Sequence, residues 1–182
     1  MSCLFLTEQD VAALIDMPRS IEIIEEAFRQ MAAGRVNNVP RTRAKGPGII
    51  LHSMSAAADY LGLIGRKNYT TTRKGMLFHV AAYDVASGEM QILIEANLLG
   101  QLRTGAATGV ATRYMSRKSS STVGLLGTGL QARTQVTAGC SVRKIDRVEV
   151  FGRDEERRRR FAEEMCKECQ TDVVPVSSSQ QA

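Results

Sequence analysis

Three small residues spaced as G-x-G-x-x-A, Gly127, Gly129 and Ala132, indicate chemistry most directly in this chain. In such a motif the first small residue permits a tight turn, and the second lets the backbone approach a pyrophosphate. The third lets the following helix pack closely on the preceding strand. Amides at the start of that helix, at Leu130 and Gln131, would face the phosphate charge. The motif therefore predicts a dinucleotide-binding turn; the alternative is a glycine turn used only for packing.

The segments around this motif have the character that a nucleotide site requires. Residues 122–126 are an apolar, partly β-branched run between a serine cluster and Gly127, which is typical of a buried parallel strand. Residues 146–151 suit a second parallel strand after a right-handed crossover. The agreement of strand, turn, helix and strand favours the nucleotide site over the packing turn.

The end of the second strand bears on which nicotinamide cofactor is bound. An NAD site usually has an acidic residue there for the ribose hydroxyls, whereas an NADP site usually has an arginine for the 2′-phosphate. This chain has Gly152 followed by Arg153 and Asp154, which favours NADP over NAD. Two alternatives stay open: Arg153 as a solvated surface residue, and Asp154 as a helix N-cap or a displaced ribose ligand.

Basic side chains recur in the region 39–96, whose short apolar or alternating segments predict an antiparallel sheet. Its clearest part is a hairpin over 76–95 with a turn at 86–88. Most such basic residues face solvent, but several on inward positions could bind a carboxylate, and a buried lysine can lose its proton for carbonyl or imine chemistry. The basic residues are Arg41, Arg43, Lys45, Arg66, Lys67, Arg73 and Lys74.

Two helices are predicted before this region. Residues 7–15 have Thr7 as N-cap and Asp10 at the third helical position. Residues 18–33 form a longer helix that ends at Gly34, with one buried stripe. The stripe contains Ile21, Ile24, Ala27, Phe28 and Met31.

A third helix is predicted over 98–115, between the sheet and the nucleotide motif. It is rich in Ala and Gly, and such small residues allow close helix packing. Arg103, beside Thr104, lies in its first turns. The pattern alone leaves Arg103 open as a surface residue or a site residue.

Composition excludes several classes of protein. The 182 residues are 43% hydrophobic, which is ordinary for a globular protein of one domain or two small ones. We expect no membrane span and no signal peptide, which favours the cytoplasm. The net charge of +5 resides largely in residues 157–160, which are interleaved with glutamates, so nucleic-acid binding is not expected. No metal site is expected either, because the C-x-x-C pair at 166–169 has no second pair or nearby histidine.

Five segments together resemble the ornithine cyclodeaminase and mu-crystallin family. They occur in the family's order with near-family spacing and cover nearly the whole chain. The helix followed by the glycine turn is the specific part. The segments are PRT at 40–42, GRK at 65–67, the turn at 84–88, LRTGAATGVATRYM from Leu102 and GLLGTGLQARTQ from Gly124.

The resemblance implies an α/β protein of two domains. Residues 1–118, including the linking helix, would form an α+β domain with a mainly antiparallel sheet that binds substrate and dimerises. Residues 119–182 would form the first half of a Rossmann-type parallel-sheet domain that binds NAD or NADP. The implied partners are a small amino acid or cyclic imine and a second copy of the chain in a homodimer.

The activity that the resemblance implies is NAD(P)-dependent amino-acid or imine chemistry, with ornithine cyclodeaminase, which converts ornithine to proline plus ammonia, as the first hypothesis. Alternatives within the family are alanine dehydrogenase and ketimine or pyrroline-carboxylate reductase. Alternatives of another class are a non-catalytic, mu-crystallin-like NADP(H)- or ligand-binding protein and an inactive truncated product.

The resemblance also implies roles for the residues of this chain that match the family's motifs. Lys67 would be catalytic, orienting the substrate and assisting proton transfer, and it would bind substrate together with Arg41 and Arg103; Arg41 would clamp the carboxylate. The cofactor would contact Arg103, Thr104, Gly127, Gly129, Leu130, Gln131 and Arg153.

The chain is shorter than family members. Residues 173–177 look like the third strand leading into a next helix, so the second half of the nucleotide fold and the family's catalytic aspartate would be absent. If these residues are the whole product, we expect weak cofactor binding, little or no turnover and an unpaired edge at the first nucleotide-domain strand.

Overall fold

The computed structural model describes residues 3–182, which form a six-stranded sheet, a three-stranded sheet and five α-helices. Two compact units are present. One contains the segment up to Ile15 together with Glu26–Gly100, and the other contains Asp16–Glu25 together with Gln101–Ala182. We call them the sheet unit and the nucleotide unit. The expected α/β class, with a mainly antiparallel sheet followed by a parallel one, is confirmed.

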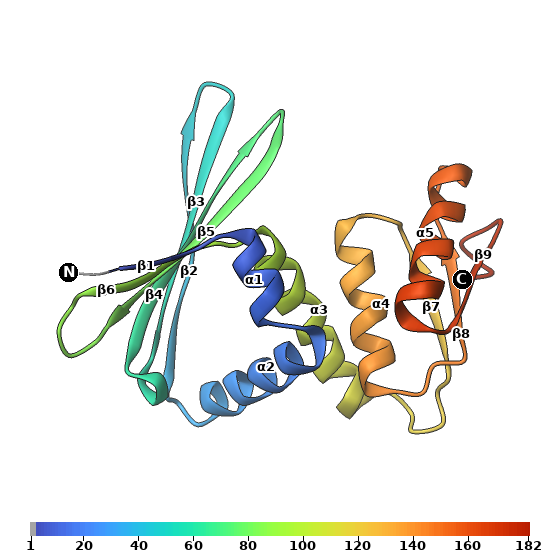
Figure 1. Ribbon diagram of the computed structural model, residues 1–182, viewed down its shortest axis with the longest axis horizontal. Coiled ribbons are helices and arrows are strands. Elements are labelled where there is room, and N and C mark those ends of the chain that lie inside the picture. Colours follow the sequence, from blue (N-terminus) through green and yellow to red (C-terminus); the bar gives the residue numbers. More distant parts are fainter. Residues whose placement is uncertain (1–2) are drawn as a thin grey trace. The chain divides into compact units, whose positions relative to one another are not determined.

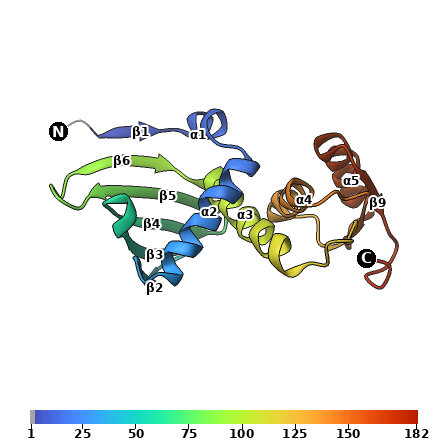
Figure 2. The same ribbon diagram turned by 90° about the horizontal axis from the view of Figure 1, so that it is seen from below.

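The sheet unit is a meander of long strands, whose order across the sheet is β1-β6-β5-β4-β3-β2 (Figure 2). Antiparallel pairing joins β2 to β6 in succession, and β1 adds in parallel to β6. The hairpin predicted over 76–95 is confirmed as β5 and β6. The strands are β1 (Leu4–Leu6), β2 (Val36–Gly46), β3 (Ile49–Ala58), β4 (Leu63–Thr72), β5 (Gly75–Asp84) and β6 (Met90–Glu95), with a 3-10 turn, η1 (Asp59–Leu61), between β3 and β4.

Helix α1 (Glu8–Leu14) begins at the N-cap that the sequence predicts. The Thr7 hydroxyl accepts from the Asp10 amide at 3.3 Å, and the Asp10 carboxylate accepts from the Thr7 amide at 2.8 Å. Hydrogen bonds from Thr7 lower the pKa of Asp10. The Glu8 carboxylate in turn accepts from the Asn97 and Leu98 amides at 2.6 and 2.9 Å, and so caps the first turn of α3 (Asn97–Met115).

Helix α2 (Met17–Ala32) is buried along only part of its predicted stripe. Ile21 is 1% exposed and packs with Met17, Ala106 and Val110. Phe28 and Met31, which we expected to be buried, are 42% and 46% exposed. That part of the prediction is wrong, because the cluster that buries the first turns of α2 does not extend to its last turns.

Two glycines of α3 allow close packing within the nucleotide unit, as predicted from its small residues. A Cβ at Gly105 would overlap the carbonyl of Thr134 in α4 (Leu130–Val142). A Cβ at Gly109 would lie 2.9 Å from the end of the Ile21 side chain. Only a residue without a side chain permits the backbone approach at Gly105.

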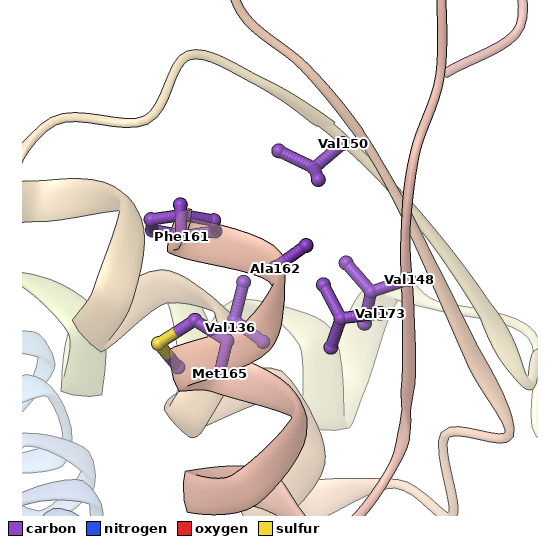
Figure 3. Packing of buried hydrophobic residues seen from close by; sticks show 7 residues of the cluster. All are labelled: Val136, Val148, Val150, Phe161, Ala162, Met165 and Val173. Carbon is purple, nitrogen blue, oxygen red and sulfur yellow. The ribbon is translucent and has the colours of Figure 1, made fainter. Parts of the chain in front are cut away.

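The parallel sheet begins the Rossmann pattern, with strand order β7-β8-β9 and all pairs parallel. Side chains from α4, α5 and the strands form its core (Figure 3): Val136, Val148, Val150, Phe161, Ala162, Met165 and Val173. The elements are β7 (Thr122–Leu126), β8 (Arg147–Phe151), α5 (Glu155–Cys169) and β9 (Asp172–Pro175). The third strand expected at 173–177 is therefore present.

Strand β7 is at the edge of this sheet, as expected, but it is not the buried strand that its apolar sequence predicts. Val123 and Leu125 pack against the core, whereas Thr122, Gly124 and Leu126 are exposed. The alternation shows that only one face of β7 is covered in the described chain.

Within residues 3–182, no group of three or more His, Cys, Asp or Glu side chains is placed to hold a metal ion. The four cysteines are free thiols. The structure's described helices include none that is long and apolar enough to cross a membrane.

Candidate functional site

The glycine turn between β7 and α4 leaves its backbone open. Gly127 has φ +107, a conformation that side chains disfavour, and its amide donates to the Phe151 carbonyl at 2.8 Å. Gly129 is the N-cap of α4. No atom lies within 4 Å of an ideal Cβ at either glycine. A phosphate group can therefore approach this backbone and the first amides of α4, as the motif predicts.

A cavity of about 270 Å³ adjoins the turn. Gly152, at the end of β8, lies so close to Thr128 that a Cβ there would be 3.1 Å from the Thr128 methyl group. The residues around this cavity fit a dinucleotide, since bare backbone and cations surround it. They are Gly127, Thr128, Gly129, Gly152, Arg153, Asp154 and Arg157.

Two arginines and one aspartate decide the charge of this cavity. Arg153 and Arg157 are both exposed. Asp154 is the N-cap of α5, and its carboxylate accepts from the Arg157 amide at 2.9 Å. Of the alternatives for Asp154, the helix N-cap is therefore confirmed. The charge pattern predicted a solvated helix face for Arg157 and did not indicate its place in this cavity. Its position four residues after Arg153, in the first turn of a helix, was the available signal.

The solvated-face prediction for residues 157–160 is correct only in part. Arg159 pairs with Glu155 at 2.6 Å across one turn of α5. Arg158, by contrast, is half-buried and donates to the Gly152 carbonyl at 2.7 Å, with its guanidinium over the Phe151 ring. Arg158 therefore anchors the end of β8 instead of facing solvent.

A second cavity of about 390 Å³ shares Thr128, Gly129, Asp154 and Arg157 with the first. Arg133 lines it, pairs with Glu164 and lies over the Phe161 ring at 5.6 Å. The hydrogen bond from Arg133 lowers the pKa of Glu164. The two cavities together extend the space beside the glycine turn along the first turns of α4 and α5.

The other predicted cofactor contacts lie on two helices. Leu130, 69% exposed, and Gln131 are in the first turn of α4. Leu130 lines the larger cavity. Arg103 is exposed and Thr104 is half-buried in α3. Neither is among the described residues that line the two cavities.

In the sheet unit, two predicted substrate residues meet at one ring. The Arg41 guanidinium carbon lies 5.6 Å from the centroid of Tyr69, and the Lys67 ammonium lies 5.7 Å from it. Lys67 is also 5.6 Å from the centroid of Phe78. Both cations were predicted from the sequence, but Tyr69 was not. Its i, i+2 spacing from Lys67 along a strand was the available signal.

His52 completes this group of side chains. Its ring stacks on Tyr69 with centroids 4.1 Å apart and planes 2° apart, and its Nε2 is 3.2 Å from the Thr71 hydroxyl. Removal from water, with the charges of Arg43 and Arg41, lowers the pKa of His52. A neutral His52 leaves Arg41 and Lys67 as the cations of the group, which suits recognition of a carboxylate.

The family model for the ornithine cyclodeaminase/mu-crystallin family matches residues 1–182. A Delta(1)-pyrroline-2-carboxylate reductase of Bacillus cereus is 28% identical over 169 residues, which are 88% of this chain and 52% of that protein. This chain thus spans about half the length of that relative.

Two solved structures have the same fold. The Delta(1)-pyrroline-2-carboxylate reductase of Thermococcus litoralis, in complex with NADH and L-proline, superposes with a TM-score of 0.90 at 30% identity, over 96% of this chain and 57% of that one. An archaeal alanine dehydrogenase dimer with bound NAD superposes with a TM-score of 0.92 at 26% identity, over 100% of this chain and 58% of that one. The family model matches the whole chain, and the antiparallel sheet and the glycine turn are both present. The chain belongs to the ornithine cyclodeaminase/mu-crystallin family.

Proposed function

We propose that this chain binds a nicotinamide dinucleotide at the Gly127 turn and the carboxylate of a small amino acid or imine at Arg41 and Lys67, as part of an NAD(P)-dependent enzyme. The observation that carries the proposal is the open glycine turn with its cationic cavity. A turn used only for packing would not need unfilled space at both Gly127 and Gly129.

When bound, the dinucleotide supplies hydride exchange at a carbon that carries nitrogen. The chain's own residues bind and orient. Gly127, Gly129 and the first amides of α4 hold phosphate, Arg41 holds a carboxylate by its fork of donors, and Lys67 directs an ammonium donor at the same anion. Lys67 is the residue proposed to assist proton transfer, and Arg103 is proposed as a contact shared by cofactor and carboxylate.

The substrate class is a small amino acid or its cyclic or open imine. Support comes from relatives and neighbours named as pyrroline-carboxylate reductase and alanine dehydrogenase. Both activities exchange hydride at the α-carbon, and ornithine cyclodeamination requires the same exchange. We therefore propose this shared step, with ornithine, alanine and pyrroline-2-carboxylate as the compounds to test.

We further propose that the cofactor is NADP(H). Gly152 supplies no carboxylate for the ribose hydroxyls, and Arg153 and Arg157 line one cavity with it. The two neighbouring structures hold NADH and NAD, so the cofactor preference of this chain needs a direct measurement.

Calorimetric titration with NADPH and NADH tests this proposal. NADPH is expected to bind more tightly, and Arg153→Ala or Arg157→Ala is expected to weaken NADPH about tenfold each while affecting NADH little. Arg159→Ala is the matched control, because Arg159 is on the same helix and pairs with Glu155. Equal or tighter binding of NADH would contradict the NADP assignment, and no binding of either would contradict the nucleotide site.

A further inference from the structure

Tyr69 is the centre of the side-chain group on the sheet. Cross-strand register aligns His52 of β3, Tyr69 of β4 and Phe78 of β5 directly opposite one another. Their rings stack in a row, with centroid distances of 4.1 Å from His52 to Tyr69 and 4.6 Å from Tyr69 to Phe78. Tyr69 is 8% exposed, so the row holds its ring in one orientation.

Both proposed substrate cations lie near this ring, Arg41 at 5.6 Å from its centroid and Lys67 at 5.7 Å. Arg41 comes from β2, within the irregularity between Val39 and Thr42, and Lys67 comes from β4 itself. His52 and Phe78 stack on the two faces of Tyr69, so the cations lie beside this stack of rings. Contact with the fixed ring of Tyr69 therefore limits where the arginine and the lysine can lie before an anion arrives.

We propose that Tyr69 is a positioning residue, whose ring holds Arg41 and Lys67 in place for the carboxylate of the substrate. This inference rests on the proposed function, because the role of the two placed cations is to bind the substrate carboxylate. The placement itself is a property of the sheet unit and can be measured separately. His52 and Phe78 support it by fixing the ring, and Tyr69 is the ring that lies near both Arg41 and Lys67.

Nuclear magnetic resonance of the 182-residue chain measures the placement without any activity. In the unsubstituted protein, ring currents of Tyr69 and Phe78 are expected to shift the Lys67 ε-methylene resonances away from their free-lysine values. Tyr69→Leu is expected to remove the Tyr69 part of that shift, and Tyr69→Phe, which keeps the ring, to retain it. Tyr83→Leu, which removes a ring from β5 and leaves the Tyr69 row intact, is the control. An unchanged Lys67 shift in Tyr69→Leu would overturn the inference, even if that variant is less stable.

Titration with L-proline, the amino acid in the Thermococcus litoralis complex, measures the consequence. Tyr69→Leu is expected to raise the dissociation constant about tenfold, because the ring that positions both cations is lost, while Tyr69→Phe stays near the unsubstituted value. Equal affinity in all three proteins would overturn the positioning role. The proposed substrate site fails if L-proline does not bind the unsubstituted chain, or if it binds Arg41→Ala and Lys67→Ala equally well. The Lys67 shift then still decides whether Tyr69 holds the lysine.

Discussion

The two units differ in how they bury apolar surface. The nucleotide unit contains both clusters of buried side chains, one under the parallel sheet and one among α2, α3 and α4. The sheet unit, whose strands are labelled β1 to β6 in Figure 1, has few buried apolar residues and several exposed ones. Ile49, Leu51, Ile64 and Leu77 are all more than two-fifths exposed, and the strand register puts them on one face.

This difference shows which unit buries more of its own apolar surface. Helices cover one side of the parallel sheet and fill its core, so that unit has its own packing. A long sheet with exposed aliphatic side chains is typical of a surface that another molecule covers. We therefore propose that a second copy of the chain covers this face.

The largest expected difference between the two units is the loss of folding stability when a methionine side chain is truncated. Met165 is 0% exposed in the nucleotide unit, and Met165→Ala should lower the free energy of unfolding by about 2–5 kcal/mol. Met76 is 53% exposed in the sheet unit, and Met76→Ala should change it by less than about 0.5 kcal/mol. Urea denaturation measures both values. Similar losses in the two variants would remove the contrast in packing.

A charge on the exposed face should break the proposed dimer. Leu51 and Leu77 both lie opposite Thr70 in the sheet, and a two-fold interface brings the same face of two copies together. Leu77→Lys should therefore raise the dimer dissociation constant about a hundredfold, because like charges would meet. Sedimentation equilibrium measures this, with Lys74→Ala on the adjacent turn as the control. A monomeric unsubstituted protein would argue against the dimer from the start.

Glycine substitution sharpens the account of packing in the nucleotide unit. Gly105→Ala should cost about 1–3 kcal/mol, since the new methyl group meets the Thr134 backbone, which cannot move independently. Gly109→Ala meets side chains and no backbone, with the end of Ile21 at 2.9 Å and the Ala138 methyl group at 3.4 Å, and should cost less. Thermal unfolding of the pair tests the difference, and the reverse order would show that helix propensity, not backbone contact, dominates.

The smallest expected effect is a pH dependence specific to the sheet unit. The pKa of His52 is lowered in the folded chain, so below its ordinary value of 6.5 the unfolded chain binds the extra proton first. Stability from His52 is complete above about pH 6.5 and is lost as the pH falls below it. His52→Phe keeps a ring on Tyr69 but cannot titrate, so its melting temperature should fall less between pH 7 and 5. An equal fall in melting temperature for the two proteins between pH 7 and 5 would contradict this assignment.

Local sequence predicted part of each unit. The β7–α4–β8 pattern and the glycine turn of the nucleotide unit, and the N-cap at Thr7 in the sheet unit, depend on neighbours within a few residues, and all are present. The predictions that failed concern burial. The apolar sequence of β7 and the stripe of α2 predicted covered surfaces, but coverage depends on elements distant in the chain.

The sequence by itself determined the strand and helix order, the small residues that α3 needs and the residue types available for phosphate and carboxylate, because backbone propensity and local spacing are encoded residue by residue. Only the tertiary structure decided that Tyr69 lies near both Arg41 and Lys67, and that Arg157 shares a cavity with Gly152 and Arg153. Those placements follow from strand register and from helix packing, which depend on contacts between residues far apart in the sequence.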